Sequence, residues 1–196
     1  MEYPQLIDAE TSKNVSAREY LRQRIARIMW VRKKWNLFQV GDFWITWEDI
    51  QDPICSEINI GLSEANREEP QAWFRDVTYE GTIKRLWYYN YPAAILEAKK
   101  RNMRLPTLKE WMTMFKCLPG GVNDKANKLN IKMTWYRSWS NNSFAWLNDC
   151  FAYWTWDEII GNKFSVHCIL GWNWSDWISR GYANKSRWAP LRLTTI

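Results

Sequence analysis

The amino-acid sequence predicts a single α+β domain that is rich in loops and carries a helical N-terminal appendage. Its 196 residues suit one domain with a short extension. Capping signals and helical spacing occur in the middle of the chain, and from Thr134 onward short Trp-dense strand patterns replace them. With 46% hydrophobic and 16% aromatic residues, the chain has enough apolar surface to bury a core, which argues against disorder.

Residues 1–36 are predicted to form the appendage. Ser16 and Glu19 have the spacing of a capping box, and the helix that they open has an apolar stripe and an otherwise basic surface. The stripe consists of Leu21, Ile25, Ile28, Met29 and Trp35. A helix of this kind docks on a core, mediates assembly or attaches a protein to a virion or another surface, and the sequence leaves its role open.

Residues 37–196 are predicted to form the folded domain, with two helices near its middle. The first is expected from Ala93 to Asn102, where good helix formers precede basic residues. The second follows Thr107 and Glu110, which have capping-box spacing, and should end at Pro119-Gly120-Gly121.

The strands of this domain are expected to be short and irregular. Phe43–Trp47 and Trp87–Tyr89 have the aromatic and β-branched composition of strands, whereas the polar stretch Gln51–Glu69 is expected to be a loop. A fold with this much loop needs large rigid side chains, and this need accounts for many of the 16 tryptophans.

The composition excludes several kinds of site. The single histidine, His167, excludes sites that need two or three imidazoles. The 4 cysteines lack C-x-x-C spacing; their number allows two disulfides, but four reduced, mostly buried thiols are expected. We therefore predict no metal and no cofactor. A net charge of +6 favours an anionic partner without requiring one.

No membrane insertion is expected from the sequence. The longest apolar stretches, such as Phe151–Trp156, are far shorter than the ~20 residues of a bilayer-spanning helix. Residues 1–10 contain acidic side chains and lack the apolar region of a signal peptide, so an intracellular or virion-associated location is expected.

Three stretches of the chain, in order, resemble the formylglycine-generating-enzyme branch of the C-type lectin fold. Arg104–Trp111 contains every fixed letter of the branch's motif R-L-P-T-x-x-E-W, which is quite specific. Asn142–Asp157 resembles the second motif more loosely. Its matching positions are Phe144, Trp154, Trp156 and Asp157.

The third stretch is Leu170–Trp174, which resembles the branch's R-G-G-S-W. The spaced arginines Arg180 and Arg187 follow it, and Leu191–Leu193 resembles the closing strand G-F-R-L. Together the three stretches cover about half of the chain, and their order implies the C-type lectin fold over the predicted domain.

The resemblance does not extend to the family's catalytic residues. Oxidases of this branch hold copper with a pair of cysteines, and the corresponding positions here are Asp176 and Gly181, which cannot supply thiolates. Iron-dependent relatives use three histidines, whereas this chain has 1. The resemblance therefore implies a protein that is not an enzyme, with a divergent enzyme of the formylglycine-generating type kept as an alternative.

Sugar binding is a second alternative. Calcium-dependent lectins of this fold class carry E-P-N or Q-P-D, neither of which is present, and Trp146-Leu147-Asn148-Asp149 imitates their W-N-D only with an insertion. A structural calcium near Asn148, Asp149 or Asp157 is conceivable from the donor types, but an ordinary turn explains these residues as well.

Non-enzymatic relatives in this branch include the variable proteins of diversity-generating retroelements, which occur in phages, bacteria and archaeal viruses. The resemblance implies a viral protein that binds a macromolecular ligand, either a protein or a cell-surface molecule. In such proteins the C-terminal region, here about residues 157–196, is diversified on a stable scaffold.

Adenine-directed mutation of asparagine codons yields Asn, Ser, Asp, Ile and Tyr but not Trp. The candidate variable, ligand-binding positions are therefore Asn173, Ser175, Asp176, Ile178, Ser179, Tyr182, Asn184 and Ser186. The candidate scaffold residues are Trp111, Trp154, Trp156, Trp172, Trp174, Trp177, Trp188 and Arg192. Adaptable polar residues held between rigid aromatic ones are typical of antibody loops, although each position alone also fits an ordinary surface loop.

Binding of single-stranded nucleic acid is the remaining alternative. The basic N-terminal helix and the cations and aromatics between Arg180 and Arg192 are of the types that hold single strands. No signature of a nucleic-acid recognition module accompanies them, so a nucleic-acid partner is not expected.

Overall fold

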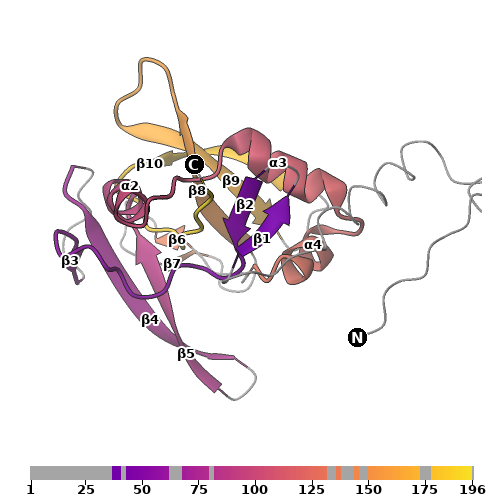
Figure 1. Cartoon of the computed structure of the whole chain (residues 1–196), viewed down its shortest axis with the longest axis horizontal. Coiled ribbons are helices and arrows are strands. Elements are labelled where there is room, and N and C mark those ends of the chain that lie inside the picture. Colours follow the sequence, from indigo (N-terminus) through magenta and orange to yellow (C-terminus); the bar gives the residue numbers. More distant parts are fainter. Residues whose placement is uncertain are drawn as a thin grey trace, which may run out of the picture.

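The computed structural model describes residues 37–40, 43–61, 68–79, 82–131, 136–137, 144–145, 150–172 and 178–195. Helices and strands both occur in these residues, so the α+β class is confirmed (Figure 1). The helices are α2 (Tyr91–Lys100), α3 (Leu108–Cys117) and α4 (Val122–Lys128). The strands are β1 (Leu37–Val40), β2 (Phe43–Thr46), β3 (Asn59–Ile60), β4 (Gln71–Tyr79), β5 (Thr82–Tyr89), β6 (Tyr136–Arg137), β7 (Phe144–Ala145), β8 (Cys150–Glu158), β9 (Ser165–Trp172) and β10 (Ile178–Asn184). The appendage predicted for residues 1–36 lies outside the described residues.

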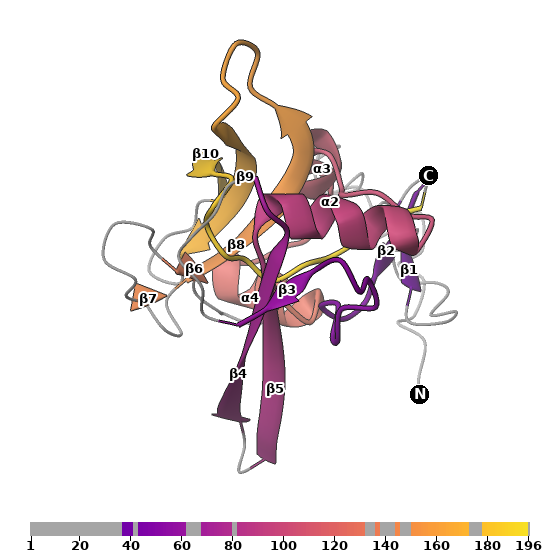
Figure 2. The ribbon, with the colours of Figure 1, turned by 90° about the vertical axis from the view of Figure 1, so that its left-hand side faces the viewer.

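The described strands form four small sheets. Two of them have three strands, in the orders β10-β9-β8 and β3-β4-β5, and the other two are the pairs β1-β2 and β6-β7. All pairings are antiparallel except that of β3 with β4. Figure 2 shows the β4–β5 hairpin and the connection between β8 and β9 extending toward opposite ends of the molecule.

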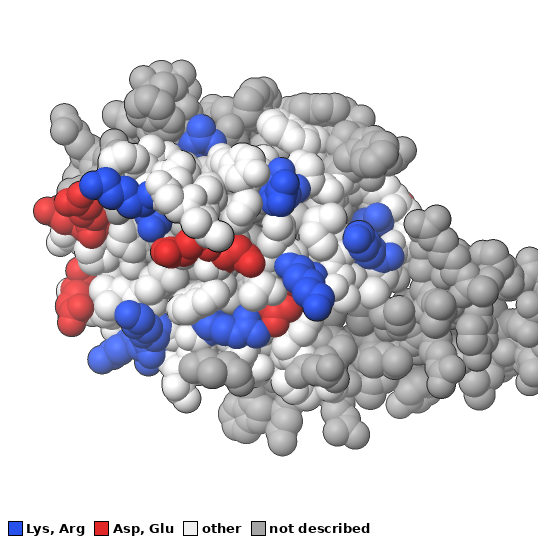
Figure 3. Space-filling view, turned by 90° about the horizontal axis from the view of Figure 1, so that it is seen from above, with Lys and Arg blue, Asp and Glu red and all other residues white. Residues whose placement is uncertain are grey.

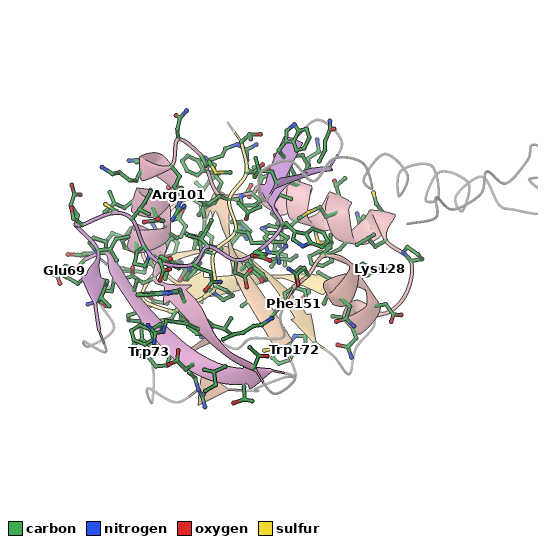
Figure 4. All side chains as sticks on the ribbon, turned by 60° about the horizontal axis from the view of Figure 1, so that its bottom comes forward. Glu69, Trp73, Arg101, Lys128, Phe151 and Trp172 are labelled. Carbon is green, nitrogen blue, oxygen red and sulfur yellow. The ribbon has the colours of Figure 1, made fainter. Side chains whose placement is uncertain are left out.

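Two hydrophobic clusters form the core, one on each side of β8 and β9. Side chains of a strand alternate between its two faces, and Trp154 accordingly packs in the cluster beneath α2. Phe151 and Tyr153 pack in the other cluster, against Trp111 and Phe115 of α3. Figure 4 places Phe151 near the centre of the molecule. The long hairpin therefore separates the two clusters, and aromatic side chains fill both of them.

The elements depart from the prediction in length and number. The strands β4 and β8 each have 9 residues, so the expectation of short strands is wrong for them. The prediction also missed α4, because Gly121 at its N-cap makes no side-chain hydrogen bond and the preceding Pro119-Gly120 is typical of a helix end. Burial of Val122 and Ala126 stabilises this helix in the absence of a capping hydrogen bond from a side chain. The stretch expected as loop contains β3, which pairs with β4.

The helix α2 begins two residues before the predicted start because Asn90 caps it. The Asn90 Oδ1 accepts hydrogen bonds from the backbone N–H of Ala93 (3.1 Å) and of Gln71 (2.9 Å). Its Nδ2 donates to the carbonyl oxygen of Glu69 at 2.8 Å. One fully buried amide therefore fixes the helix start against the first residues of β4.

Glu97 ties the chain between β2 and β3 to α2. Its side chain is fully buried and accepts hydrogen bonds from the backbone N–H groups of Ile54 (3.0 Å) and Cys55 (3.2 Å). Arg101 donates to the same carboxylate at 2.7 Å and, through Nη2, to the carbonyl oxygen of Asp52 at 3.2 Å. These bonds hold an otherwise irregular segment in one place.

The C-terminal segment closes the domain by pairing with residues far away in the sequence. Thr46 donates its backbone N–H to the carbonyl oxygen of Leu193 at 2.9 Å, and Thr194 exchanges backbone hydrogen bonds with Arg104. The strand β2 and the last residues of the described chain therefore lie side by side.

Candidate functional site

The edge strand β10 carries the described part of the predicted ligand-binding region. It pairs with β9 along its whole length, from Ile178 opposite Gly171 to Asn184 opposite Ser165. Ser179, Arg180 and Tyr182 are exposed, and Tyr182 keeps 58% of its accessible surface. The middle of β10 therefore presents side chains to solvent while its backbone is fixed by β9.

Tyr182 is the centre of a small cluster on one face of this sheet. Its ring lies beside that of His167 on β9, with the centroids 5.0 Å apart, and the Arg180 guanidinium carbon lies 5.9 Å from the Tyr182 ring. The His167 Nδ1 is buried and has no hydrogen-bond partner among the described residues. An aromatic ring, a cation and an imidazole together can bind polar, anionic and planar groups of a ligand.

The predicted variable positions are not all on the surface. Ile178 is half-buried and packs against the cluster around Phe151. Asn184 uses its Oδ1 to accept hydrogen bonds from the backbone N–H and the Oγ of Ser186, both at 3.0 Å. Ser186 is only 5% exposed, so its expected display to solvent is wrong: the turn that Asn184 caps folds it inward. Asn173, Ser175 and Asp176 lie outside the described residues.

Most of the predicted scaffold residues that the structure describes are buried. Trp111, Trp154, Trp188 and Arg192 are at most 2% exposed, and Trp172 is half-buried. Trp156 is 44% exposed, which corrects the expectation that it is a core residue. The reason is a register shift in β8 between Trp154 and Glu158, which breaks the pairing with β9. Trp174 and Trp177 lie outside the described residues.

The first two sequence motifs contact each other beside this surface. Asp157 accepts a hydrogen bond from the backbone N–H of Leu108, the first residue of α3, at 2.5 Å. The neighbouring Trp156 donates its backbone N–H to the carbonyl oxygen of Pro106 at 3.0 Å. The acidic end of β8 is therefore positioned at the positive end of α3, which is a favourable electrostatic arrangement.

The predicted capping box is confirmed and is reinforced by an arginine. Thr107 accepts a hydrogen bond from the backbone N–H of Glu110, and Glu110 accepts one from the backbone N–H of Thr107 at 2.6 Å. Arg104 adds two parallel hydrogen bonds to the Glu110 carboxylate, at 2.6 and 2.8 Å. This bidentate pair fixes the approach of the chain to α3.

We expect acid to weaken this arrangement. Burial raises the pKa of Glu110, but hydrogen bonds from Arg104 and Thr107 outweigh it, so the pKa falls below the usual 4.5. A carboxylate with a lowered pKa in the folded state stabilises the fold fully above its unfolded pKa, and this stabilisation is lost as the pH falls through the folded value.

The measurement is urea unfolding of the wild-type chain and of Glu110→Gln at several pH values from about 6 down to 3. The free energy of unfolding of the variant should depend less steeply on pH below 4.5, the unfolded pKa of the glutamate. Parallel pH profiles of the two proteins would contradict the expectation.

Sequence reasoning did not single out His167 as part of a binding surface. The residue was considered only as a metal ligand, and its contact with Tyr182 depends on the register of β9 and β10. No local sequence pattern predicts this register, because the paired residues His167 and Tyr182 lie on different strands and are separated by the connecting segment.

The four cysteines are buried and free of disulfides, as expected. Burial raises the pKa of the Cys168 thiol to about 12, so this thiol stays protonated at neutral pH. Among the described residues there is no group of three or more His, Cys, Asp or Glu side chains able to hold a metal ion. The described helices also include none with the length and apolar character needed to span a membrane.

Comparison of the chain with models of protein families, with curated proteins and with solved structures finds no match.

Proposed function

We propose that the protein is a non-enzymatic ligand-binding protein with a C-type lectin fold, similar to the variable proteins of diversity-generating retroelements. Its C-terminal surface binds a macromolecular ligand, either a protein or a cell-surface molecule. The observation that carries the proposal is the contrast within one sheet: Ser179 and Tyr182 are exposed on β10, whereas Trp154 on β8 is buried.

Two features of the fold support the lectin-like part of the proposal. The specific motif Arg104–Trp111 contacts Trp156 and Asp157, two matching positions of the looser second motif. The segment Leu191–Leu193, which resembles the family's closing strand, returns to β2 and ends the domain there. Residues of the first two motifs are therefore in mutual contact, although they are about 50 positions apart in the sequence.

The arrangement of β10 also suits a surface whose residues are exchanged. The exposed side chains of Ser179 and Tyr182 make no hydrogen bond to other described residues, so replacing them removes little that stabilises the fold. The backbone beneath them is fixed by the ladder to β9, which lowers the conformational entropy lost when a ligand binds.

The nucleic-acid alternative receives no support from the charge distribution that Figure 3 shows. Over this face of the described residues, Lys and Arg are interspersed with Asp and Glu and form no continuous basic stripe. A stripe of one sign is the electrostatic feature that binding to a phosphate backbone requires. We therefore keep a protein or cell-surface ligand as the proposed partner.

The test is a displayed library of the full chain in which Ser179, Arg180 and Tyr182 are randomised, selected against immobilised lysozyme as an arbitrary protein target. Most members should stay folded, with unfolding free energies within about 0.5 kcal/mol of the wild type, because exposed positions contribute little to stability. Selection should enrich members that bind lysozyme.

A matched library randomised at the buried positions Ala183, Ser186 and Ala189 is the control. Most of its members should fail to fold, and none should be enriched. If the surface library unfolds as often as the buried one, or yields no binder, the proposed function is wrong.

A further inference from the structure

The outer edge of β5 is partly occupied by the chain itself. Tyr89, the last residue of β5, donates its backbone N–H to the carbonyl oxygen of Ala189 at 2.8 Å and accepts the Ala189 N–H at 3.1 Å. The backbone groups of Tyr89 therefore point away from β4. Asn90, the next residue, instead donates to Gln71 at the start of β4, as the alternation of an antiparallel pair requires.

The same alternation fixes the direction of the backbone farther along β5. Because Tyr89 faces outward, Trp87, Arg85 and Ile83 also direct their N–H and C=O groups away from β4. Within the described residues, no backbone hydrogen bond to Ile83 or Arg85 is found on this outer side. As far as the described residues show, β5 from Ile83 to Trp87 is therefore an open strand edge with a regular row of donors and acceptors.

An open cleft of about 440 Å³ lies along this part of β5. It is lined by Gln51, Asp52, Asp76, Ile83, Arg85 and Trp87. Gln51 and Asp52 form the wall of the cleft that faces β5. They lie on the same side of β5 as Ala189, because the preceding residue, Ile50, donates its backbone N–H to the carbonyl oxygen of Leu191 at 2.7 Å. After the bridge between Ala189 and Tyr89, the C-terminal segment therefore leaves β5 and runs toward Ile50. The cleft begins at the point where this segment leaves β5.

The charged side chains of the cleft differ in whether they form an ion pair. Arg85 is engaged by Asp76, with Nε at 2.9 Å from Oδ1, and its guanidinium lies 4.1 Å from the centre of the Phe74 ring. Asp52 is exposed, and its carboxylate forms no ion pair with another described residue. The backbone of Asp52 is held in a left-handed conformation (φ 53°) by the bond from Arg101. The negative charge of the Asp52 side chain is therefore available to a ligand.

We propose that this cleft binds an extended segment of a partner protein, which adds to the outer edge of β5 as a further strand and places a Lys or Arg beside Asp52. An extended polypeptide is the ligand whose donors and acceptors repeat at the spacing of a strand edge. The bridge between Tyr89 and Ala189 is a one-residue example of the same pairing within this chain. The proposal concerns a surface distinct from β10 and does not depend on the proposed function.

The probe is the peptide Ac-Thr-Val-Thr-Lys-Thr-Val-Thr-NH₂, titrated into the full chain and followed by NMR of the backbone amides. Binding should slow amide hydrogen exchange at Ile83 and Arg85 by at least ~10-fold, since a new hydrogen bond must open before exchange. A peptide with the same side chains but with N-methyl groups on alternate residues should not protect these amides.

Two variants test the edge and the charge separately. Ile83→Pro removes an outward N–H without removing a bond to β4, and should weaken binding about 10-fold, whereas Ile83→Thr keeps the donor and should weaken binding much less than Ile83→Pro does. Asp52→Asn should weaken binding of the Lys peptide by about 2-fold to 5-fold and leave a peptide with Gln in place of Lys unaffected. Asn tolerates the left-handed backbone at this position, so this variant should fold.

Equal binding of the N-methylated peptide, or of Asp52→Asn, would overturn the proposal even if Ile83→Pro failed to fold. Protection of Ile83 and Arg85 that rises with protein concentration without peptide would also overturn it, because β5 would then pair with a second copy of the chain. All of these results are independent of Ser179 and Tyr182, so they leave the proposed function untouched.

Discussion

Arg192→Met should lower the free energy of unfolding by about 3–5 kcal/mol, because it removes one partner of a buried ion pair. Arg192 is 1% exposed and donates through Nε to the Asp49 carboxylate at 2.9 Å. Its Nη1 donates to the carbonyl oxygen of Leu129 at 2.8 Å and its Nη2 to that of Asn130 at 2.7 Å. Tyr153 donates its hydroxyl to the same carboxylate at 2.7 Å.

The reason for the large effect is that one guanidinium satisfies groups from two distant parts of the chain, Asp49 and the residues just after α4. Its loss leaves a buried carboxylate without its cation and leaves two carbonyl oxygens at the end of α4 without these donors. Methionine fills much of the volume of the arginine stem, so the effect measures the lost polar partners more than a cavity.

The measurement is urea unfolding at neutral pH, with Arg180→Met as the matched control. Arg180 is exposed on β10 and makes no ion pair with another described residue, so its replacement should change stability by less than about 0.5 kcal/mol. A loss of less than about 1 kcal/mol for Arg192→Met would mean that the buried network contributes little to the fold.

Trp154→Ala should be about as damaging, with a loss of about 3–5 kcal/mol, because it empties a large volume in the core. Trp154 is 2% exposed, its Nε1 donates to the carbonyl oxygen of Tyr89 at 2.8 Å, and its ring meets that of Tyr91 edge-on at 5.6 Å. It joins β8 to the end of β5 and the start of α2, so its loss loosens three elements at once.

Trp156→Ala is the matched control, two residues farther along the same strand. This side chain is 44% exposed, and its replacement should cost less than about 1 kcal/mol. Thermal and urea unfolding of the two variants give the comparison. Similar losses in both would contradict the assignment of Trp154 to the scaffold and of Trp156 to the surface.

These two predictions bear on the proposed function because a display surface needs a rigid support. Trp154 and Arg192 lie on opposite sides of the sheet that carries β10, and both are buried. If the stability of the domain is concentrated in such residues, the exposed positions Ser179 and Tyr182 are free to change. The same reasoning explains why the buried Ser186 is a poor position for variation.

Local patterns were sufficient to predict several elements of this fold. The α+β class, the helix around Ala93–Lys100 and the capping box of Thr107 and Glu110 each depend on residues within a few positions of one another. The burial of the cysteines followed in the same way from composition, since free thiols behave as small hydrophobic side chains.

By itself, then, the sequence determined the helices α2 and α3 and that tryptophans are abundant enough to support long loops. Only the tertiary structure decided which tryptophans are buried, that Ser186 faces inward, and that Tyr182 lies beside His167. The physical reason is that helix capping is a contact between near neighbours in the chain, whereas burial and strand register are set by partners many residues away. The open edge of β5 belongs to the second group, because it begins where the C-terminal segment turns away from β5 after the bridge between Ala189 and Tyr89.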